Sequence, residues 1–385
     1  MPNSPDYLSQ ALTAAGVLTD QWFPSSAPTN WVPDDYWRAP VICTLLTDLM
    51  TQTNKVDYTA TVEAARVKGE WNLTNCMYYD DLTWWGRLFM HAYEYFKSQS
   101  KTDLAQLYLA DAKVVCDQLS QGWDQFATPE YCGGGIWWMR EWFPPGPPYN
   151  PRTTFKASNS TLGFMETALA LYLELGDQVY LDLGQKCWDW LVKWKFLDDQ
   201  GLIWGALVPG KCELDPENVP VLSLQGEGLA PLWMLYKATN KTEYLDVADK
   251  VAEGTMAKMV WEGTQIMQDR GDAKWDSQTN DWKLQNSGDT PFKGLFATYL
   301  GEYTKNVSTL RPEQAAKYAA FLRANADAVW TNYPGAIVGM DWRTLHQNYQ
   351  PLPKDNKPIP NSDYVNASLQ YSGVCALAAA ALVSI

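Results

Sequence analysis

The stretch Leu173-Glu-Leu-Gly-Asp-Gln-Val-Tyr180-Leu181 ends one helical pattern of apolar residues, turns at Gly-Asp, and begins the next pattern at Tyr-Leu. The same hinge recurs in Lys237-Ala-Thr-Asn-Lys-Thr-Glu-Tyr244-Leu245, and a looser copy runs from Lys101 to Tyr108-Leu109. Helical hairpins of this kind bury one another's apolar faces. The hinge therefore predicts a fold made of repeated helical hairpins.

Outward from these hinges, apolar residues recur at helical spacing in about twelve segments, and few alternating β-branched runs compete with them. Twelve helices in six hairpins suggest an all-α, closed double ring of helices, with the loops at one end free to build a cleft. We expect one domain over residues 1–385. The expected helical segments are 5–19, 36–53, 57–67, 78–98, 103–121, 157–176, 178–195, 222–238, 241–258, 289–304, 311–330 and 365–382.

Composition and charge exclude several classes of protein. With 385 residues, 46% of them hydrophobic and 19% charged, the chain can bury a large core. Its 44 acidic and 30 basic residues give a formal charge of −14, which repels nucleic acid but does not disfavour a neutral polysaccharide. Two histidines and no Cys-x-x-Cys pair predict no metal site and no cofactor. The apolar end, 375–385, is too short to span a membrane, so we expect a buried last helix in preference to a lipid-anchor signal.

Several features point to a secretory pathway. The start Met1-Pro-Asn-Ser-Pro lacks the basic and apolar regions of a signal peptide, and we expect that the numbering begins after a removed signal. We therefore expect a monomeric, secreted or cell-wall-associated glycoprotein. Five Asn-x-Ser/Thr sequons fit that expectation, at Asn72, Asn159, Asn240, Asn306 and Asn366.

Seven cysteines would permit disulfides outside the cell, although the odd count leaves at least one thiol. The connectivity cannot be deduced from the sequence. Cys76 and Cys132 both border aromatic motifs, so a bridge between them would join the two loops.

Two adjacent carboxylates stand among four aromatic residues in Tyr78-Tyr79-Asp80-Asp81-Leu-Thr-Trp84-Trp85. Burying an unpaired acid raises its pKa, so two acids among large rings need a reason. A glycosidase supplies one, because it needs one ionised and one protonated carboxyl near the same bond. The alternative is a helix start, where acids cap free amides and favour the positive end of the dipole.

A second motif, Tyr131-Cys-Gly-Gly134-Gly135-Ile-Trp137-Trp138, places three glycines where a backbone can turn sharply or approach a ligand. It lacks the Gly-Lys-Ser/Thr of a phosphate-binding loop. The chain has 20 Trp and 21 Tyr, and flat amphipathic rings of this kind stack on sugar faces when they line a groove. The alternative for these rings is core packing.

These motifs follow one another in an order that resembles glycoside hydrolase family 76, the endo-α-1,6-mannanases and related cell-wall mannan transglycosylases. The resemblance covers most of the chain, and the two aromatic motifs together are its specific part. It implies an (α/α)6 barrel that cleaves α-1,6-linked mannose backbones with net retention. The matching pieces are the Asp80-Asp81 motif, His91-Ala-Tyr-Glu94, the Gly133–Trp138 motif, Lys156, Gln225-Gly226 and Asp289-Thr-Pro-Phe-Lys293-Gly-Leu-Phe296.

The resemblance implies that Asp80 is the nucleophile and Asp81 the acid/base. We expect stacking or wall residues and hydroxyl ligands in the subsites, although Asp289 would equally serve as a helix cap. Two runs depart from the family pattern, Ser223-Leu-Gln-Gly226 and Lys156-Ala-Ser-Asn159, and a glycan at Asn159 would crowd a polymer substrate. The expected substrate-binding residues are Tyr79, Trp84, Trp85, Gly134, Gly135, Trp137, Trp138, Gln225 and Asp289.

Chain geometry is compatible with retention by adjacent residues. Neighbouring α-carbons lie about 3.8 Å apart and adjacent side chains diverge by roughly 100° around a helix, so the two carboxyls can end about 5 Å apart, as retention requires. We expect the helix dipole and amide donors to keep Asp80 ionised. We expect Tyr78, Tyr79 and the indoles to raise the pKa of Asp81.

Three other functions fit parts of the sequence. A transglycosylase acting on α-mannan, or on the mannose core of a lipid anchor, would use the same residues with a sugar hydroxyl in place of water. A carbohydrate-binding protein would keep the tryptophans without needing both acids. A terpene-cyclase-like helical enzyme would need Asp-Asp-x-x-Asp for magnesium, and position 84 is Trp.

Overall fold

The computed structural model describes residues 6–23, 35–54, 56–125, 132–140, 156–208, 210–269, 272, 274–276, 281–283, 290–334, 337–344 and 366–384. This part of the chain is mostly helical, as the sequence predicts, with one short antiparallel hairpin of β1 (Lys274–Asp276) and β2 (Asp281–Lys283). The helices are α1 (Tyr7–Trp22), α2 (Asp35–Thr53), α3 (Thr59–Asn75), α4 (Tyr79–Ser98), α5 (Thr102–Gln121), α6 (Ser158–Leu175), α7 (Gln178–Lys193), α8 (Leu222–Thr239), α9 (Glu243–Lys258), α10 (Phe292–Val307), α11 (Pro312–Asn332) and α12 (Ala367–Leu382).

Each of the twelve expected segments corresponds to a helix, and most ends agree to within three residues. The hinge between α6 and α7 shows why. Gly176 takes the left-handed conformation, with φ 70°, and ends α6, while the Asp177 side chain accepts a hydrogen bond from Val179 N and starts α7. The exception is α3, which continues eight residues past the expected end at 67. It passes through Gly69, where an added Cβ would lie 2.3 Å from the indole of Trp85.

The described residues form two compact units. The first unit takes its residues from Met1–Asp35, Val221–Gly226 and Ala252–Ile385, and the second from Tyr36–Pro220 and Glu227–Val251. Three of the four boundaries fall inside helices: after the first residue of α2, within α8 and within α9. A single domain over 1–385 stays a prediction.

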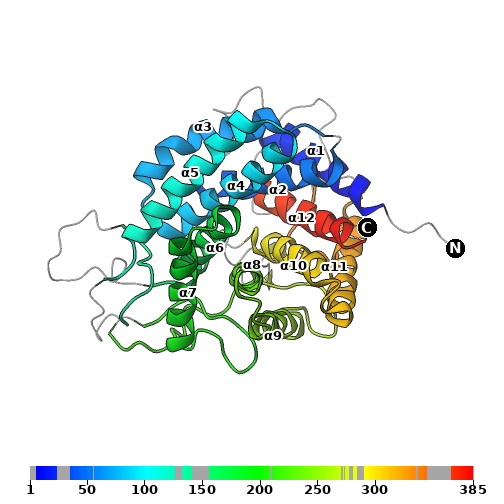
Figure 1. Cartoon of the computed structure of the whole chain (residues 1–385). Helices are drawn as coiled ribbons and strands as arrows, with labels where there is room; N and C mark the ends of the chain where they lie inside the picture. The colour runs from blue at the N-terminus through cyan, green and yellow to red at the C-terminus, as the bar shows by residue number, and fades with distance from the viewer. Residues whose placement is uncertain are drawn as a thin grey trace. The chain divides into compact units, whose positions relative to one another are not determined.

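In the first unit, α12 is the central helix and packs against α1, α10 and α11 (Figure 1). All residues of α12 from Ala367 to Ala381 are buried, which explains why this helix is apolar on all sides and confirms the expected buried last helix. No helix among the described residues has both the length and the apolar character that crossing a membrane requires.

In the second unit, α4 packs against α5 and α6, and α6 packs against α7, so the predicted hairpins α4–α5 and α6–α7 are confirmed (Figure 1). Two glycines allow α4 and α6 to approach closely. A Cβ added at Gly163 would lie 2.3 Å from Thr83 Cβ, and one added at Gly86 would lie 2.5 Å from Thr167 Oγ1. Small residues therefore set the spacing between these two helices.

Gly163→Ala is expected to destabilise the protein by about 1–3 kcal/mol, because the new methyl group would overlap Thr83 in a packed interface. Thermal unfolding measures the effect. Gly16→Ala is the matched control, since Gly16 lies in α1 with no atom within 4 Å of an added Cβ. There alanine should stabilise the helix slightly. Equal effects of the two substitutions would contradict the close contact between α4 and α6.

Candidate active site

Asp80 and Asp81 lie in the first turn of α4, which begins at Tyr79 after the extended backbone of Tyr78. The helix start that the sequence offered as an alternative is therefore present. Both acids are half-buried. A helix N-terminus favours negative charge, so the position suits a pair of carboxyls without excluding a chemical role.

Three donors from three segments converge on the carboxyl group of Asp80. Its Oδ2 accepts hydrogen bonds from Trp138 Nε1 at 2.9 Å and from Asn159 Nδ2 at 2.8 Å. Its Oδ1 accepts from the backbone N–H of Asp81 at 3.0 Å. Trp138 comes from the 132–140 segment and Asn159 from the first turn of α6, so the site depends on tertiary structure.

The pKa of Asp80 is shifted in a direction that the sequence did not predict. Burial raises it above the ordinary value for an aspartate, and the hydrogen bonds from Trp138, Asn159 and Asp81 lower it in part. An ionised carboxyl can accept all three hydrogen bonds, whereas a protonated one would turn one oxygen into a donor. Burial therefore disfavours the ionised form of Asp80, and the three hydrogen-bond donors favour it.

The 132–140 segment is held between the start of α4 and the end of α5 by backbone hydrogen bonds. On one side Tyr79 N donates to Trp138 O at 2.9 Å. On the other, Trp137 N donates to Gly122 O at 3.0 Å, and Asp124 N donates to Gly135 O at 2.9 Å. This explains how Trp138 is carried to Asp80.

The glycines of this segment pack against a tryptophan of α7. Gly134 and Gly135 have φ values of 89° and 76°, and a Cβ on either would lie within 3 Å of the Trp190 ring. Trp190 also donates from Nε1 to Cys132 O at 2.9 Å. Both glycines are buried, so the structure explains them by backbone conformation and close packing.

A buried lysine anchors the same segment. Lys156 Nζ lies 2.7 Å from Asp124 Oδ2, donates to Gly134 O at 2.5 Å, and stands 4.4 Å from the centre of the Trp137 ring. We call these four residues the Lys156 cluster. Burial lowers the pKa of Lys156, and Asp124 raises it in part. The cluster joins the residues that follow α5, the 132–140 segment and the residues that precede α6.

The disulfide of the chain joins Cys132 to Cys212, across 80 residues of sequence. The suggested bridge between Cys76 and Cys132 is wrong. Cys76 is a buried thiol whose Sγ donates to Tyr78 O at 2.9 Å. The observed bridge joins the 132–140 segment to the turn that carries Cys212. The spacing of the cysteines in the sequence does not predict this pairing.

Replacing both Cys132 and Cys212 by serine is expected to lower the free energy of unfolding by about 2–4 kcal/mol, because the bridge closes a long loop. Urea unfolding with and without a reductant measures it. Reductant should lower the midpoint of the unsubstituted protein and leave that of the double variant unchanged. A midpoint of the unsubstituted protein that ignores reductant would contradict a stabilising bridge.

The aromatic residues expected in the subsites differ in how deeply they are buried. Trp137 and Trp138 are half-buried, and the Trp138 ring lies 4.9 Å from that of Tyr78. Tyr79 and Trp84 are buried, and Trp85 is 1% exposed against Phe89. Core packing, the alternative weighed from the sequence, describes Trp85 in this part of the chain.

Two hydroxyl ligands were expected from the sequence, Gln225 and Asp289. Gln225 belongs to the first unit, is fully buried in α8, and donates from Nε2 to Val221 O at 3.1 Å. Asp289 lies outside the described residues. Their roles in substrate binding stay predictions.

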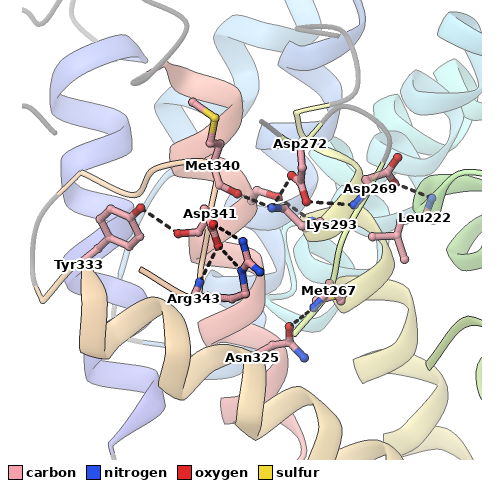
Figure 2. A network of polar contacts seen from close by, with 12 residues as sticks. Leu222, Met267, Asp269, Asp272, Lys293, Asn325, Tyr333, Met340, Asp341 and Arg343 are labelled. Carbon is pink, nitrogen blue, oxygen red and sulfur yellow. Dashed lines mark hydrogen bonds and ion pairs between the residues drawn. The ribbon is translucent and has the colours of Figure 1, made fainter. Parts of the chain in front are cut away.

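Lys293, which belongs to the family-like motif, forms a comparable cluster in the first unit (Figure 2). Its Nζ lies 2.6 Å from Asp272 Oδ1, also donates to Met340 O, and stands 4.8 Å from the centre of the Trp342 ring. Burial raises the pKa of Asp272, while Lys293 lowers it in part. We call these four residues the Lys293 cluster. Each unit therefore holds a buried lysine by a carboxylate, a carbonyl and an indole.

The sequence did not identify Asn159, Lys156 or Asp124 as parts of one site. Asn159 and Lys156 did stand out, because the Lys156-Ala-Ser-Asn159 run departs from the family pattern and contains a sequon. Nothing in the sequence distinguishes Asp124 from the other acidic residues. Its role depends on a contact with Lys156, 32 residues away.

Comparison with known proteins gives a family and several relatives. Residues 9–360 match Glycosyl hydrolase family 76. A putative mannan endo-1,6-alpha-mannosidase of Schizosaccharomyces pombe is 27% identical over 266 residues, covering 68% of this chain and 54% of the relative. Mannan endo-1,6-alpha-mannosidase DFG5 of Saccharomyces cerevisiae is 26% identical over 252 residues, covering 64% and 49%. The chain thus spans about half the length of these relatives.

A solved structure has the same fold. It is an inactive variant of the alpha-1,6-mannanase GH76A of Salegentibacter sp. HEL1_6, with two consecutive aspartates replaced by alanine, in complex with alpha-1,6-mannotetrose. The TM-score is 0.75 at 20% identity, covering 98% of this chain and all of that one. The likeness confirms the expected fold class, an all-α (α/α)6 barrel.

Proposed function

Because the chain belongs to glycosyl hydrolase family 76, a family of glycosidase-like enzymes, we propose that it cleaves α-1,6-mannosidic bonds in mannan with net retention. The observation that carries the proposal is the carboxyl group of Asp80. It lies beside Asp81 at a helix start and accepts hydrogen bonds from three donors on three segments.

In the proposed first step, a carboxylate oxygen of Asp80 attacks the anomeric carbon of the mannosyl unit. The bond from that carbon to the leaving oxygen breaks, its electron pair goes to the oxygen, and Asp81 supplies the proton. In the second step, Asp81 takes a proton from water, which attacks the same carbon and releases Asp80. Two displacements restore the original anomeric configuration.

The comparisons support the substrate class. The Salegentibacter enzyme is an alpha-1,6-mannanase, its variant with two consecutive aspartates replaced is inactive, and that variant binds alpha-1,6-mannotetrose. Two fungal relatives carry the name mannan endo-1,6-alpha-mannosidase. Endo action, a monomeric state and secretion or cell-wall association remain predictions from the sequence.

The test is product analysis. The protein is incubated with linear and branched α-1,6-mannan and with an α-glucan, and proton NMR follows the anomeric form of each new reducing end. We expect α-mannose ends from the linear mannan first. A parallel reaction with added mannobiose as acceptor separates hydrolysis from transglycosylation, because only transfer lengthens the acceptor. No release from any α-mannan, with no transfer, would overturn the proposal.

A further inference from the structure

The side-chain amide of Asn159 is fixed at both ends. Its Nδ2 donates to Asp80 Oδ2 at 2.8 Å, and its Oδ1 accepts from the backbone N–H of Ser160 at 2.9 Å. An amide oxygen cannot donate, so the contact with Ser160 fixes which end faces Asp80. Ser160 N–H lies in the first turn of α6 and has no partner within the helix ladder. Asn159 therefore links a helix start to the carboxyl group.

The backbone around Asn159 is held as well. Ser158 N donates to Gly205 O at 2.8 Å, and Ser158 Oγ donates to Trp204 O at 2.7 Å. Two residues on, Thr161 Oγ1 accepts from Ile136 N at 3.2 Å. The first turn of α6 is thus attached on both sides of Asn159, which keeps its amide directed at Asp80.

Asp80 has dipolar partners instead of a cationic one. The charged groups on the packed segments have other partners: Lys156 pairs with Asp124, and Arg87 pairs with Glu166. Arg140 lies 5.6 Å from the ring centre of Tyr79 and donates to Leu73 O, and Asp81 adds a second acid on the same helix. Within the described ranges Asp80 forms no ion pair, so neutral donors carry the stabilisation of its charge.

We propose that Asn159 is a positioning residue of the active site, whose amide acts with the Trp138 indole to hold Asp80 in place and in its ionised form. A consequence is that the Asn159 sequon is not a glycan acceptor in the working protein, because its acceptor nitrogen is the atom that contacts Asp80. The proposal rests on the proposed function for its catalytic part only.

Asn159→Asp is the sharpest variant, because it keeps the size of the side chain and an oxygen for Ser160 N–H while it replaces the donor by an acceptor. Asn159→Ala removes both contacts, and Trp138→Phe removes the second donor while it keeps a ring. All three should raise the pKa of Asp80, since each removes a hydrogen bond to its charged form. The acid limb of the kcat/KM profile should move up by about one pH unit or more.

Asn240→Ala is the matched control. Asn240 is an exposed sequon asparagine of the same unit, and its substitution should leave the pH profile unchanged. Thermal unfolding shows whether each variant is folded. A merely structural role for Asn159 would lower stability without moving the acid limb, and kcat should fall more than KM rises if the amide acts on the nucleophile.

A second readout does not need substrate. Selective ¹³C labelling of aspartate carboxyls lets NMR follow the titration of Asp80, assigned by the loss of its signal in Asp80→Asn. Asp80 should titrate at higher pH in Asn159→Asp and Asn159→Ala than in the unsubstituted protein. If the unsubstituted protein acts on no mannan but this shift appears, the proposed function fails and the positioning contact stands. If mannan is cleaved and neither titration nor pH profile moves, the positioning role is wrong.

Site occupancy tests the consequence for glycosylation. The chain is produced in a eukaryotic secretory host and deglycosylated by peptide N-glycosidase in ¹⁸O water, which labels each formerly glycosylated asparagine. We expect label at the exposed Asn240 and none at Asn159. Label at Asn159 in catalytically active protein would overturn the proposal.

Discussion

Replacing Asp80 by alanine is expected to lower kcat for α-1,6-mannan by about 10⁴-fold or more, because no covalent intermediate can form without the nucleophile. Asp80→Asn should be similarly inactive. The loss should leave KM within a few-fold of its original value. The measurement is reducing-end release under saturating mannan, with thermal unfolding to show that each variant is folded.

Rescue by azide separates the roles of the two acids. In Asp80→Ala, azide can enter from the nucleophile's side and attack an aryl α-1,6-mannobioside, giving the β-mannosyl azide. In Asp81→Ala, the activated substrate still forms the Asp80 intermediate, and azide in the second step gives the α-mannosyl azide. The two variants therefore serve as controls for each other. The α product from Asp80→Ala would mean that the assignments are exchanged, and normal mannan hydrolysis by that variant would end the proposal.

The largest expected effect on stability comes from Asp124→Ala, at about 3–5 kcal/mol. Lys156 is 2% exposed at its side chain, and Asp124 1% exposed. Removal of the carboxylate leaves a buried ammonium whose remaining partners, among the residues that the structure describes, are the Gly134 carbonyl and the Trp137 ring. Denaturant unfolding at neutral pH gives the value, with Asp272→Ala in the Lys293 cluster as the matched variant in the other unit.

The pH dependence of that loss has a definite sign. The folded-state pKa of Lys156 already lies below its ordinary value and should fall further without Asp124. The unfolded chain then binds more protons than the folded chain between that pKa and about 10.4, so stability rises with pH in this window. The destabilisation should therefore be largest at neutral pH and shrink toward alkaline pH.

The single variant Lys156→Met and the double variant Asp124→Ala/Lys156→Met complete a thermodynamic cycle with Asp124→Ala. Since the double variant has no Lys156 ammonium left to bury, it should be more stable than Asp124→Ala alone. Additive losses would show that the two side chains do not interact in the folded protein. The same cycle bears on activity, because the Lys156 cluster positions the segment that carries Trp138 to Asp80.

The helices were predictable because residues close together in the sequence determine where each helix begins and ends. Apolar spacing and hinge chemistry, such as Gly176 and Asp177, determine where α6 ends and α7 begins. The end of α3 was not predictable, since glycine disfavours a helix interior and the packing of Gly69 against the Trp85 ring is a tertiary contact. The β1–β2 hairpin was also missed, because each strand has only three residues.

The site was predictable only where its residues are neighbours in sequence. Asp80 and Asp81 were identifiable because acids among aromatics are unusual. Asn159 and Trp138 contact Asp80 from 79 and 58 residues away, and one sequence carries no signal for such pairing. In the sequence, Asn159 stood out as a sequon whose glycan would crowd a polymer substrate. The raised pKa of Asp80 was missed for the same reason, because burial depends on packing.

The two lysine clusters provide chemical reporters of local opening. Among the lysines that the structure describes, Lys156 and Lys293 are the buried ones. An amine enclosed by a carboxylate, a carbonyl and an indole reacts with an acylating reagent only when its surroundings open. Because each unit contains one such amine, the two labelling rates, read by mass spectrometry from a single sample, report the opening of each unit separately.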